Sequence, residues 1–568
     1  MRFFYNKTES VSERKAWAAS LLINVFFLLL CILFGRFVYG AIDDFFMAGI
    51  LTGIYGGENN VHLTFVNVIY GYALLPLYHL FPQIGWYFIG EIAAVFISLV
   101  VICFIIIKKT NEIWGAVLSI LFLSVAGRDH YLVTQFTQCA TVLSASGMLC
   151  FIYTLERISR QEKLIPFYFF TSVILILWGS VMRWEAFLMG WPLFIAALIW
   201  LAKKYQKEKF RALSGLLIIA LCTWGAHEFD RVHYSSSEYY TYMDFQKKRA
   251  ILGDGRVYKD QAVYEDLEEM GQSGVDYGLL KDWVFYDNEV FAPDSLDIIM
   301  GLLQKYKYEY SYYYLPSNML NGLIKFLKFP ITWLWFIFSL LLYVSCRKNI
   351  LYIWLNLILV LLLMAYLQII GRPVYRVENG FWVYATVLLI PMMNVVPTMR
   401  KVYFGGLIAL LLSVNIFVYA YLGEIVKQPN TGDYAEMINK NPKEDIQGLW
   451  NYIKESPDSN VFLVDHNTYM MFAQRLNPPY LAEPKNSWNK IIPMGYWTPY
   501  FPDVELEFHK RGIVNPMKDV VNDNVFVVGD VNLKSFLQLH YYDVSYEEIR
   551  DFEGIKVLKY HRIVKEAK

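Results

Sequence analysis

The sequence contains little charge and no surplus of either sign. Only 18% of its 568 residues are charged, and its 51 Lys and Arg residues are matched by 51 Asp and Glu residues. This balance gives no support to a nucleic-acid partner, whose footprint would be a basic surplus. Hydrophobic residues reach 56% and aromatic residues 17%, which is too apolar for an ordinary soluble protein. A lipid bilayer is therefore the expected solvent.

Cysteine is scarce as well, and the long polar segments contain none. The six cysteines lie inside apolar stretches: Cys31, Cys103, Cys139, Cys150, Cys222 and Cys346. We therefore expect neither a disulfide framework nor a cysteine metal site. The first apolar stretch, residues 16–39, is longer than a signal-peptide core and has no A-x-A cleavage pattern at its end, so we expect it to be a retained first helix.

Long apolar stretches dominate the first three quarters of the chain. About 20 apolar residues span a hydrocarbon core of about 30 Å at 1.5 Å per residue. The sequence predicts eleven transmembrane helices: residues 16–39, 84–107, 113–127, 134–154, 164–182, 186–202, 211–227, 320–345, 350–370, 381–398 and 402–422. Basic clusters lie between these stretches, and the positive-inside rule places such clusters in the cytoplasm.

One further apolar stretch, residues 63–81, decides the topology. If it crossed the membrane, the basic cluster at Lys108 and Lys109 would lie outside; if it does not, all basic clusters share one side. We therefore expect residues 63–81 to form a helix that lies at the outer membrane face, with its tyrosines at the interface. The prediction is a multi-pass protein of the cell membrane with a cytoplasmic N-terminus and an extracytoplasmic C-terminus.

This topology divides the chain into two domains. Residues 1–425 form a polytopic α-helical membrane domain with external loops at residues 40–83 and 228–319, and residues 426–568 form a small extracytoplasmic domain. Runs of hydrophobic residues bounded by turn residues predict strands at residues 460–465, 524–530 and 555–560. Helical patterns lie between them, at residues 446–454 and 533–541. The C-terminal domain is therefore predicted to be α/β.

Two adjacent acids, Asp43 and Asp44, open the first external loop directly after the first predicted span. Paired carboxylates at a membrane interface are costly unless they face water, a cation or a substrate. The alternative is a solvated cap for the helix that follows. Both interpretations stay open on the residues alone.

Other polar residues gather at the same outer level. Glu91 lies about five residues inside the outer end of its span, and an acid at membrane depth is a candidate for a functional site or for a hydrogen bond to a neighbouring helix. The remaining candidates are Arg128, Asp129, Arg183, Glu185, Arg372 and Arg376. Loop arginines also anchor proteins to lipid headgroups, but acids and arginines from four loops share one face here.

The order of these features resembles a known family. A basic N-terminus, a first span, Ile42-Asp43-Asp44-Phe45, a juxtamembrane helix, further spans, a late Arg372-Pro-x-x-Arg376 loop and an external C-terminal domain are similar to the GT-C class of membrane glycosyltransferases. That class includes the protein O-mannosyltransferases and the aminoarabinose transferases of lipid A. The resemblance covers residues 1–425, and the acidic pair is its sharpest motif.

The resemblance implies an inverting transfer of a hexosyl or pentosyl group from a polyprenyl-phosphate carrier to an acceptor hydroxyl on the outer face. Asp43 or Asp44 matches the catalytic base of the family, and Arg372 or Arg376 matches its late basic residue, which would offset charge on the leaving phosphate. The other five polar candidates would help to bind substrate, with Arg128 and Asp129 as a second acidic position.

The implied partners are a polyprenyl-phosphate-linked sugar, a glycan, lipid or protein acceptor of the cell envelope, and membrane lipids. No cofactor is assigned, and a divalent cation stays open, since His62 and His79 are too far apart in sequence to establish a metal site. A transporter or lipid flippase is the alternative function. Such proteins often show repeats and charges at mid-membrane, whereas here no repeat is seen and the charges share one face. A sensor or scaffold would not need eleven spans.

Overall fold

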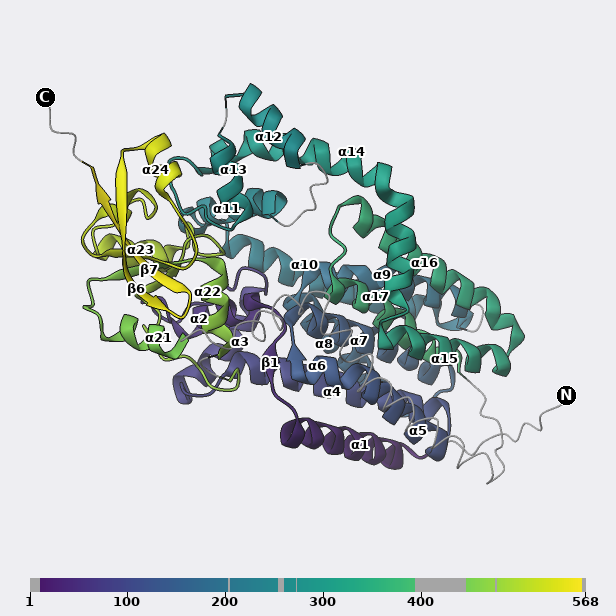
Figure 1. The fold of residues 1–568 in the computed structure, drawn as a ribbon. Helices are drawn as coiled ribbons and strands as arrows, with labels where there is room; N and C mark the ends of the chain where they lie inside the picture. The colour runs from purple at the N-terminus through teal and green to yellow at the C-terminus, as the bar shows by residue number, and fades with distance from the viewer. Residues whose placement is uncertain are drawn as a thin grey trace, which may run out of the picture.

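The computed structural model describes residues 11–202, 205–253, 260–271, 273–393, 446–475 and 478–563. Helices make up most of the molecule, and the sheet formed by the C-terminal strands lies at one end of the helical part (Figure 1). The predicted span at residues 402–422 lies outside the described residues, as does the end of the predicted span at 381–398.

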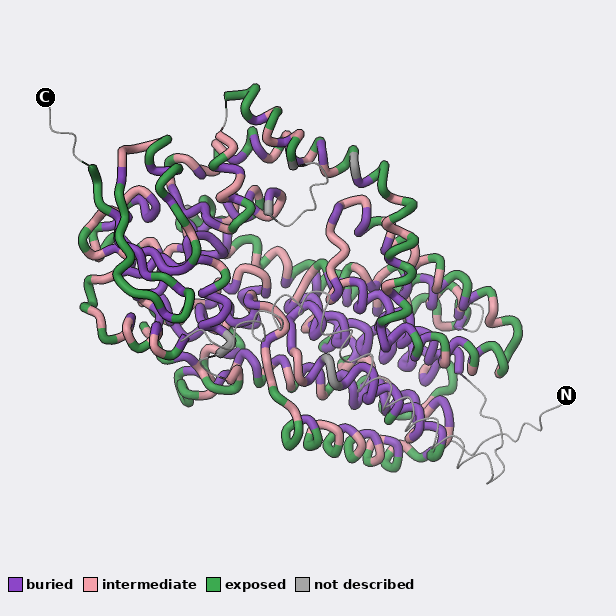
Figure 2. Tube along the Cα trace, viewed as in Figure 1, coloured by how far each residue is buried: buried purple, intermediate pink, exposed green. Residues whose placement is uncertain are grey.

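Seven of the described helices are long and apolar enough to cross a membrane. They include α1 (Glu13–Phe34), α4 (Trp86–Lys109), α7 (Phe136–Ser159), α8 (Ile165–Met182), α9 (Trp184–Leu201), α10 (Lys209–His233) and α16 (Ile350–Ile369). The most apolar stretch of α7 is entirely buried, whereas α1 is largely exposed, and Figure 2 shows this contrast between the centre and the edge of the bundle. The chain is a multi-pass membrane protein, as predicted.

The predicted span at residues 320–345 is not one continuous helix. Helix α14 (Pro293–Phe326) ends where α15 (Pro330–Ser345) begins, and the two axes are bent by 79°. Pro330 starts α15, a position at which its missing N–H costs no hydrogen bond. The two helices count as one broken span or as a re-entrant segment, which brings the number of described spans to eight at most. The predicted number of eleven is not confirmed.

Two apolar stretches form shorter elements. Residues 68–80 form α3 (Val68–Leu80), whose 13 residues measure about 20 Å, too short to cross a bilayer. Helix α5 (Glu112–Phe122) continues as a π-helix, η1 (Leu123–Gly127), and then as α6 (Arg128–Leu132). Helix α17 (Tyr375–Val387) follows the loop that contains Arg372. The side on which each loop lies stays a prediction.

The predicted external loop at residues 228–319 is mainly helical. It contains α11 (Ser237–Gly253), α12 (Asp260–Glu269), α13 (Gly274–Lys281) and the first part of α14. Of these helices, α11 and α13 lie next to the C-terminal region, where they contact α23 and α24 (Figure 1). Backbone hydrogen bonds from Phe285 and Tyr286 to the Met494 carbonyl join this segment to the C-terminal region.

The C-terminal region is α/β, as predicted, with a five-stranded mixed sheet in the order β4-β3-β5-β7-β6. Its strands are β3 (Val461–Val464), β4 (Ile491–Pro493), β5 (Val525–Val528), β6 (Val544–Phe552) and β7 (Ile555–Arg562), and its helices are α21 (Ile446–Glu455), α22 (His466–Arg475), α23 (Pro502–Lys510) and α24 (Lys534–His540). Three strands and two helices match the predicted ranges. The sequence analysis missed β4, which has three residues, and β6, in which only the first and last residues are buried.

Candidate functional site

Helix α2 (Ile42–Thr52) presents the acidic pair, and both of its ends are fixed. Strand β1 (Val38–Tyr39) pairs in parallel with β2 (Val133–Thr134), so the chain enters α2 at the start of α7. Asp43 and Asp44 lie in the first turn, where the helix dipole favours negative charge. Gly53 ends the helix in the left-handed conformation at φ 68°, which glycine adopts without strain. The direction of the two acids is therefore set by the backbone.

Asp43 is held by aromatic donors from the C-terminal region. The Tyr496 hydroxyl donates to Asp43 Oδ1 over 2.7 Å, and the Trp497 indole N–H donates to the same oxygen over 2.9 Å. Arg376 Nη2 lies 3.9 Å from the other oxygen, Oδ2. Among the described residues, none donates a hydrogen bond to Oδ2, and the side chain is 15% exposed. One oxygen thus orients the carboxyl group, and the other stays available.

Asp44 points into the protein and is fully buried. Its Oδ1 accepts hydrogen bonds from the Tyr87 hydroxyl and from the Phe136 backbone N–H, each over 3.1 Å. Glu91 on α4 lies close enough to interact electrostatically with Asp44, and neither Asp44 Oδ2 nor either Glu91 oxygen has a hydrogen-bond partner among the described residues. Two buried carboxylates this close disfavour ionisation of both, so one of these two groups carries a proton.

Burial raises the pKa of Asp44 to about 8, and the charge of Asp43 raises it too, although hydrogen bonds from Phe136 and Tyr87 lower it. At neutral pH this carboxyl is therefore mainly uncharged. Adjacent acids that looked equivalent in the sequence have different surroundings: Asp43 faces the site, and Asp44 joins α2 to α4 and α7.

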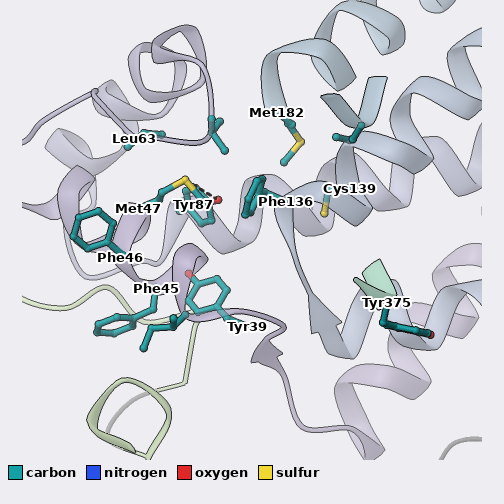
Figure 3. Packing of buried hydrophobic residues seen from close by; sticks show 14 of the residues in the cluster. Tyr39, Phe45, Phe46, Met47, Leu63, Tyr87, Phe136, Cys139, Met182 and Tyr375 are labelled. Atoms are coloured by element: carbon teal, nitrogen blue, oxygen red, sulfur yellow. Dashed lines mark hydrogen bonds between the residues drawn. The ribbon is translucent and has the colours of Figure 1, made fainter. Parts of the chain in front are cut away.

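Hydrophobic packing keeps α2 in place. Figure 3 shows Phe45, Phe46 and Met47 of α2 among buried side chains, with Tyr87 of α4 close to Met47. The Tyr87 hydroxyl lies 3.9 Å from the Met47 sulfur. Phe46 is fully buried against Tyr496, with 6.0 Å between ring centroids. The aromatic donor of Asp43 thus packs against the helix that carries Asp43.

Arg376 lies beside the carboxylate, and two further arginines, Arg183 and Arg372, lie near it in the same cluster. Arg183, between α8 and α9, interacts electrostatically with Arg372, Arg376 and Asp43. Burial lowers the pKa of Arg183; Glu185 and Asp43 oppose this effect, and the charges of Arg372 and Arg376 add to it. Guanidinium groups keep their proton at neutral pH. Three positive charges beside one carboxylate leave a net positive site.

Glu185 neutralises part of this positive charge, but its side chain is largely exposed. Its Oε2 pairs with Arg183 Nε over 2.8 Å, and its side chain is 68% exposed. The Arg183 guanidinium also lies over the rings of Phe65 and Phe136, at 5.6 and 5.5 Å from their centroids. Cation–π contacts of this kind fix a guanidinium without neutralising it. The cluster is therefore suited to bind an anion.

Aromatic residues from two distant segments form the other wall. Arg249 of α11 is buried with its guanidinium 3.8 Å from the Trp497 ring centroid and 4.8 Å from that of Trp283. His466, at the start of α22, stacks on Trp283 at 5.1 Å. Burial lowers the pKa of His466 to about 4, opposed by Asp43 and aided by Arg249, so its ring is neutral at pH 7. Its buried Nδ1 has no hydrogen-bond partner in the described part of the chain.

The backbone of this wall is strained. Trp283 has φ 60° and Tyr496 has φ 51°, a left-handed conformation that costs non-glycine residues about 1–3 kcal/mol each. Gly495 permits their approach, since a Cβ there would lie 2.1 Å from the Trp283 carbonyl oxygen. Strained residues gather at functional sites because surrounding contacts must hold them. Here they place an indole and a phenol at the acid.

The structure brings together five of the residues singled out in the sequence: Asp43, Arg183, Glu185, Arg372 and Arg376. Asp44 on α2 and Glu91 on α4 form a separate buried pair of acids. Arg128 and Asp129 lie in α6, and their side chains lie outside the description. The roles of all nine stay predictions. No group of three His, Cys, Asp or Glu in the described ranges is arranged to hold a metal ion.

Sequence reasoning missed Tyr496, Trp497, His466, Trp283 and Arg249, which lie far from Asp43 in the chain. The only local signal is the run Gly495-Tyr496-Trp497-Thr498-Pro499-Tyr500. Glycine and proline in such a run predict a turn, and its aromatic residues are unusual for an exposed loop. The run could have been singled out, but not assigned to the acid.

No protein-family model and no curated protein sequence matches the chain. Among solved structures, the chain is similar to crystal structures of ArnT from Cupriavidus metallidurans bound to undecaprenyl phosphate and in the apo state. Each is 10% identical with a TM-score of 0.38, over 96% of this chain and 97% or 98% of the other. A likeness at this level transfers no activity to this chain.

Proposed function

We propose that the protein is a membrane glycosyltransferase that moves a sugar from a polyprenyl-phosphate carrier to an acceptor hydroxyl, with Asp43 as the base. The observation that carries the proposal is the position of Asp43: one oxygen is held by Tyr496 and Trp497, and the other faces a cluster of arginines. A base beside an anion site is what transfer between a phosphate and a hydroxyl requires.

The reaction can be written with these groups. Asp43 Oδ2 takes the proton of the acceptor hydroxyl while the hydroxyl oxygen forms a bond to the anomeric carbon of the sugar. The bond between that carbon and the phosphate oxygen breaks, and its electron pair goes to the phosphate. One direct displacement inverts the anomeric centre. A positioned base contributes about 10² to 10⁴ in rate.

The arginines match the charge that develops on the leaving group. The carrier phosphate gains a negative charge when the sugar leaves. Arg372 lies on the loop that follows α16, a candidate membrane span, and Arg376 lies in the first turn of α17. A guanidinium offers two parallel N–H donors to phosphate. Arg183 adds a third charge from the loop between α8 and α9. These residues would bind the phosphate while the prenyl chain stays in the bilayer.

Trp283 is the half-buried member of the aromatic wall, and the negative quadrupole of an indole face attracts the C–H-rich face of a sugar ring. Tyr496 and Trp497 are buried and hold Asp43. The unpartnered Nδ1 of His466 offers a neutral hydrogen-bonding group for a hydroxyl. We infer that residues 228–319 and the C-terminal domain together form the acceptor side, on the outer face of the membrane.

A transporter would need charged groups along a path through the bundle. The described charges near Asp43 instead share one end of it, and at the other end the Lys109 ammonium is paired with Glu156 and bonded to the Pro391 carbonyl. This distribution supports the enzyme.

Purified protein in lipid nanodiscs tests the proposal. It would be incubated with polyprenyl-phosphate hexoses and pentoses, radiolabelled in the sugar, and with lipid and glycan acceptors from cell envelopes. We expect release of polyprenyl phosphate and labelled acceptor with at least one donor. Wild-type protein that binds no donor and transfers no sugar, while an Asp43→Asn variant behaves identically, would refute it. Glu112→Gln, at a side chain that is 62% exposed and not part of the candidate site, is the matched control.

A further inference from the structure

A cavity of about 650 Å³ lies on the side of α2 that faces away from Asp43. Its walls come from the end of α1, the start of α4, one face of α2 and residues 478–483 of the C-terminal region. The volume is within the range of about 300–1,000 Å³ that small-molecule sites occupy. Neither Asp43 nor the arginines and aromatic residues placed around it line this cavity, so it is separate from the candidate site.

The helix geometry separates the two sites. Phe45, Ala48, Gly49 and Thr52 of α2 line the cavity, at the spacing of one helix face. At about 100° per residue, this face is turned about 180° from Asp43. A ligand in the cavity would therefore lie behind the catalytic helix and could not contact the Asp43 carboxylate.

The cavity borders the lipid phase. Leu28 and Ile32 of α1 and Ile89 and Ile92 of α4 line it, and both helices are candidate membrane spans. Ile32 is 52% exposed, so one wall reaches the surface that lipid covers. Apolar walls open to a bilayer favour a hydrocarbon chain over a water-soluble ligand.

One cation lies at the polar end. Arg36 lines the cavity two residues after α1 ends, and among the described residues it has neither an ion pair nor a hydrogen-bond partner. Glu483 also lines the cavity, but it is buried and accepts a hydrogen bond from the Trp488 indole over 3.3 Å. The exposed charge is therefore positive, which matches a lipid phosphate.

We propose that this cavity binds one acyl chain of an anionic bilayer lipid, with its phosphate at Arg36. The site is built from both ends of the chain: Gly85 N–H donates to the Tyr480 carbonyl over 2.9 Å, Ala482 N–H donates to the Gln83 carbonyl over 3.0 Å, and Ile84 bridges Leu481. A Cβ on Gly85 would lie 2.2 Å from the Pro479 carbonyl oxygen. A bound lipid would join the C-terminal region to α1 and α4.

Photocrosslinking in nanodiscs tests this site. The probe is phosphatidylglycerol with a diazirine near the end of one acyl chain, and labelled peptides are mapped by mass spectrometry. Lipid around the protein reaches the outer faces of α1 and α4, whereas the inner positions Ala48, Thr52 and Glu483 are reached by lipid inside the cavity. We expect labels on these inner positions, and labels confined to α1 and α4 would overturn the proposal.

Variants separate the chain site from the headgroup site. Ala48→Trp fills the cavity and should abolish the inner labels, and Ile32→Trp at the rim repeats the test if Ala48→Trp does not fold. Leu22→Trp, at an α1 residue that is 69% exposed, is the matched control and should leave the labels unchanged. Inner labels that persist in both cavity variants would overturn the acyl-chain site.

Arg36→Gln should lower the preference for phosphatidylglycerol over phosphatidylcholine about fivefold, as expected from about 1 kcal/mol per arginine near a charged headgroup. Arg231→Gln, at a guanidinium that is 72% exposed, is its control. Equal labelling by both lipids in the wild type would overturn the anionic headgroup. Asp43→Asn should keep the inner labels, so failure of the proposed glycosyltransferase activity and failure of the lipid site would be told apart.

Discussion

Replacement of Asp43 by asparagine changes the proposed base with almost no change in volume. The amide oxygen can still accept from the Tyr496 hydroxyl and the Trp497 indole, as Oδ1 does over 2.7 and 2.9 Å. The new NH₂ group takes the place of Oδ2, which lies 3.9 Å from Arg376 Nη2. An ion pair at this distance between partly exposed groups is worth about 0–1 kcal/mol. The variant should therefore insert and fold.

Its activity should fall much more than its stability. An amide cannot accept the acceptor's proton at neutral pH, and loss of a positioned base costs about 10² to 10⁴ in rate, equal to about 3–5 kcal/mol of activation free energy. The measurement is the initial rate of transfer from a polyprenyl-phosphate sugar at matched protein levels, together with the melting temperature of each variant in nanodiscs.

Asp44→Asn is the matched control at the neighbouring position. Because Asp44 is mainly uncharged at neutral pH, its amide keeps an oxygen for Tyr87 and Phe136 and supplies a donor for Glu91. We expect transfer within about threefold of the wild type, a change of under about 1 kcal/mol. Loss in Asp44→Asn with retention in Asp43→Asn would reverse the assignment, and retention in both would refute the mechanism.

Four other predictions follow from single contacts. Arg376→Lys keeps the charge but loses the guanidinium fork, so steady-state transfer should weaken, and Arg376→Ala should weaken it more; equal rates in all three forms would remove Arg376 from the site. Trp497→Phe keeps a ring beside Arg249 but loses the N–H that orients Asp43. The activation free energy of transfer should therefore rise by up to about 1.5–3 kcal/mol, with little change in melting temperature. The folded-state pKa of Asp44 is about 8, above its unfolded value of about 3.9. The folded state therefore holds more protons between these values, and the free energy of unfolding falls as the pH rises from about 4 to 8. Melting temperatures across this window should fall less steeply in Asp44→Asn than in the wild type. A reporter fused after Lys109 should report cytoplasm, and an external signal would mean that α3 crosses the membrane and that the site lies on the other side.

Much of the fold can be predicted from the sequence because apolar length is a strong signal. A stretch such as residues 84–107 has no alternative to a membrane helix, and α4 is found at Trp86–Lys109. The break between α14 and α15 was missed because apolar residues continue through it, although Pro330 marks the place. Strand β4 was missed because three residues carry no alternation that could be recognised.

The candidate site, too, could be predicted from the sequence only in part. Asp43 and Arg376 could be singled out because charges are rare in this chain and costly at a membrane. Tyr496 and Trp497 could not be assigned, since they lie more than 450 positions from Asp43 and reach it only through the docking of a separate region. Burial, which distinguishes Asp44 from Asp43, is likewise a property of the packing against Tyr87 and Glu91 and not of the local sequence.

The different roles of Asp43 and Asp44 depend on how α2 packs against the neighbouring helices. Asp44 must be buried against α4 and the start of α7 for its hydrogen bonds to Tyr87 and Phe136 to form. Once these bonds form, the first turn of α2 cannot rotate, and Asp43 must point about 100° away along the helix, toward Tyr496 and Trp497. An uncharged Asp44 also avoids a second negative charge behind α2, which would weaken the attraction of the arginines for Asp43 and compete with it for their charge. The proposed base is thus positioned by a neighbouring acid that is mainly uncharged at neutral pH, and only Asp43 is proposed to act as a carboxylate.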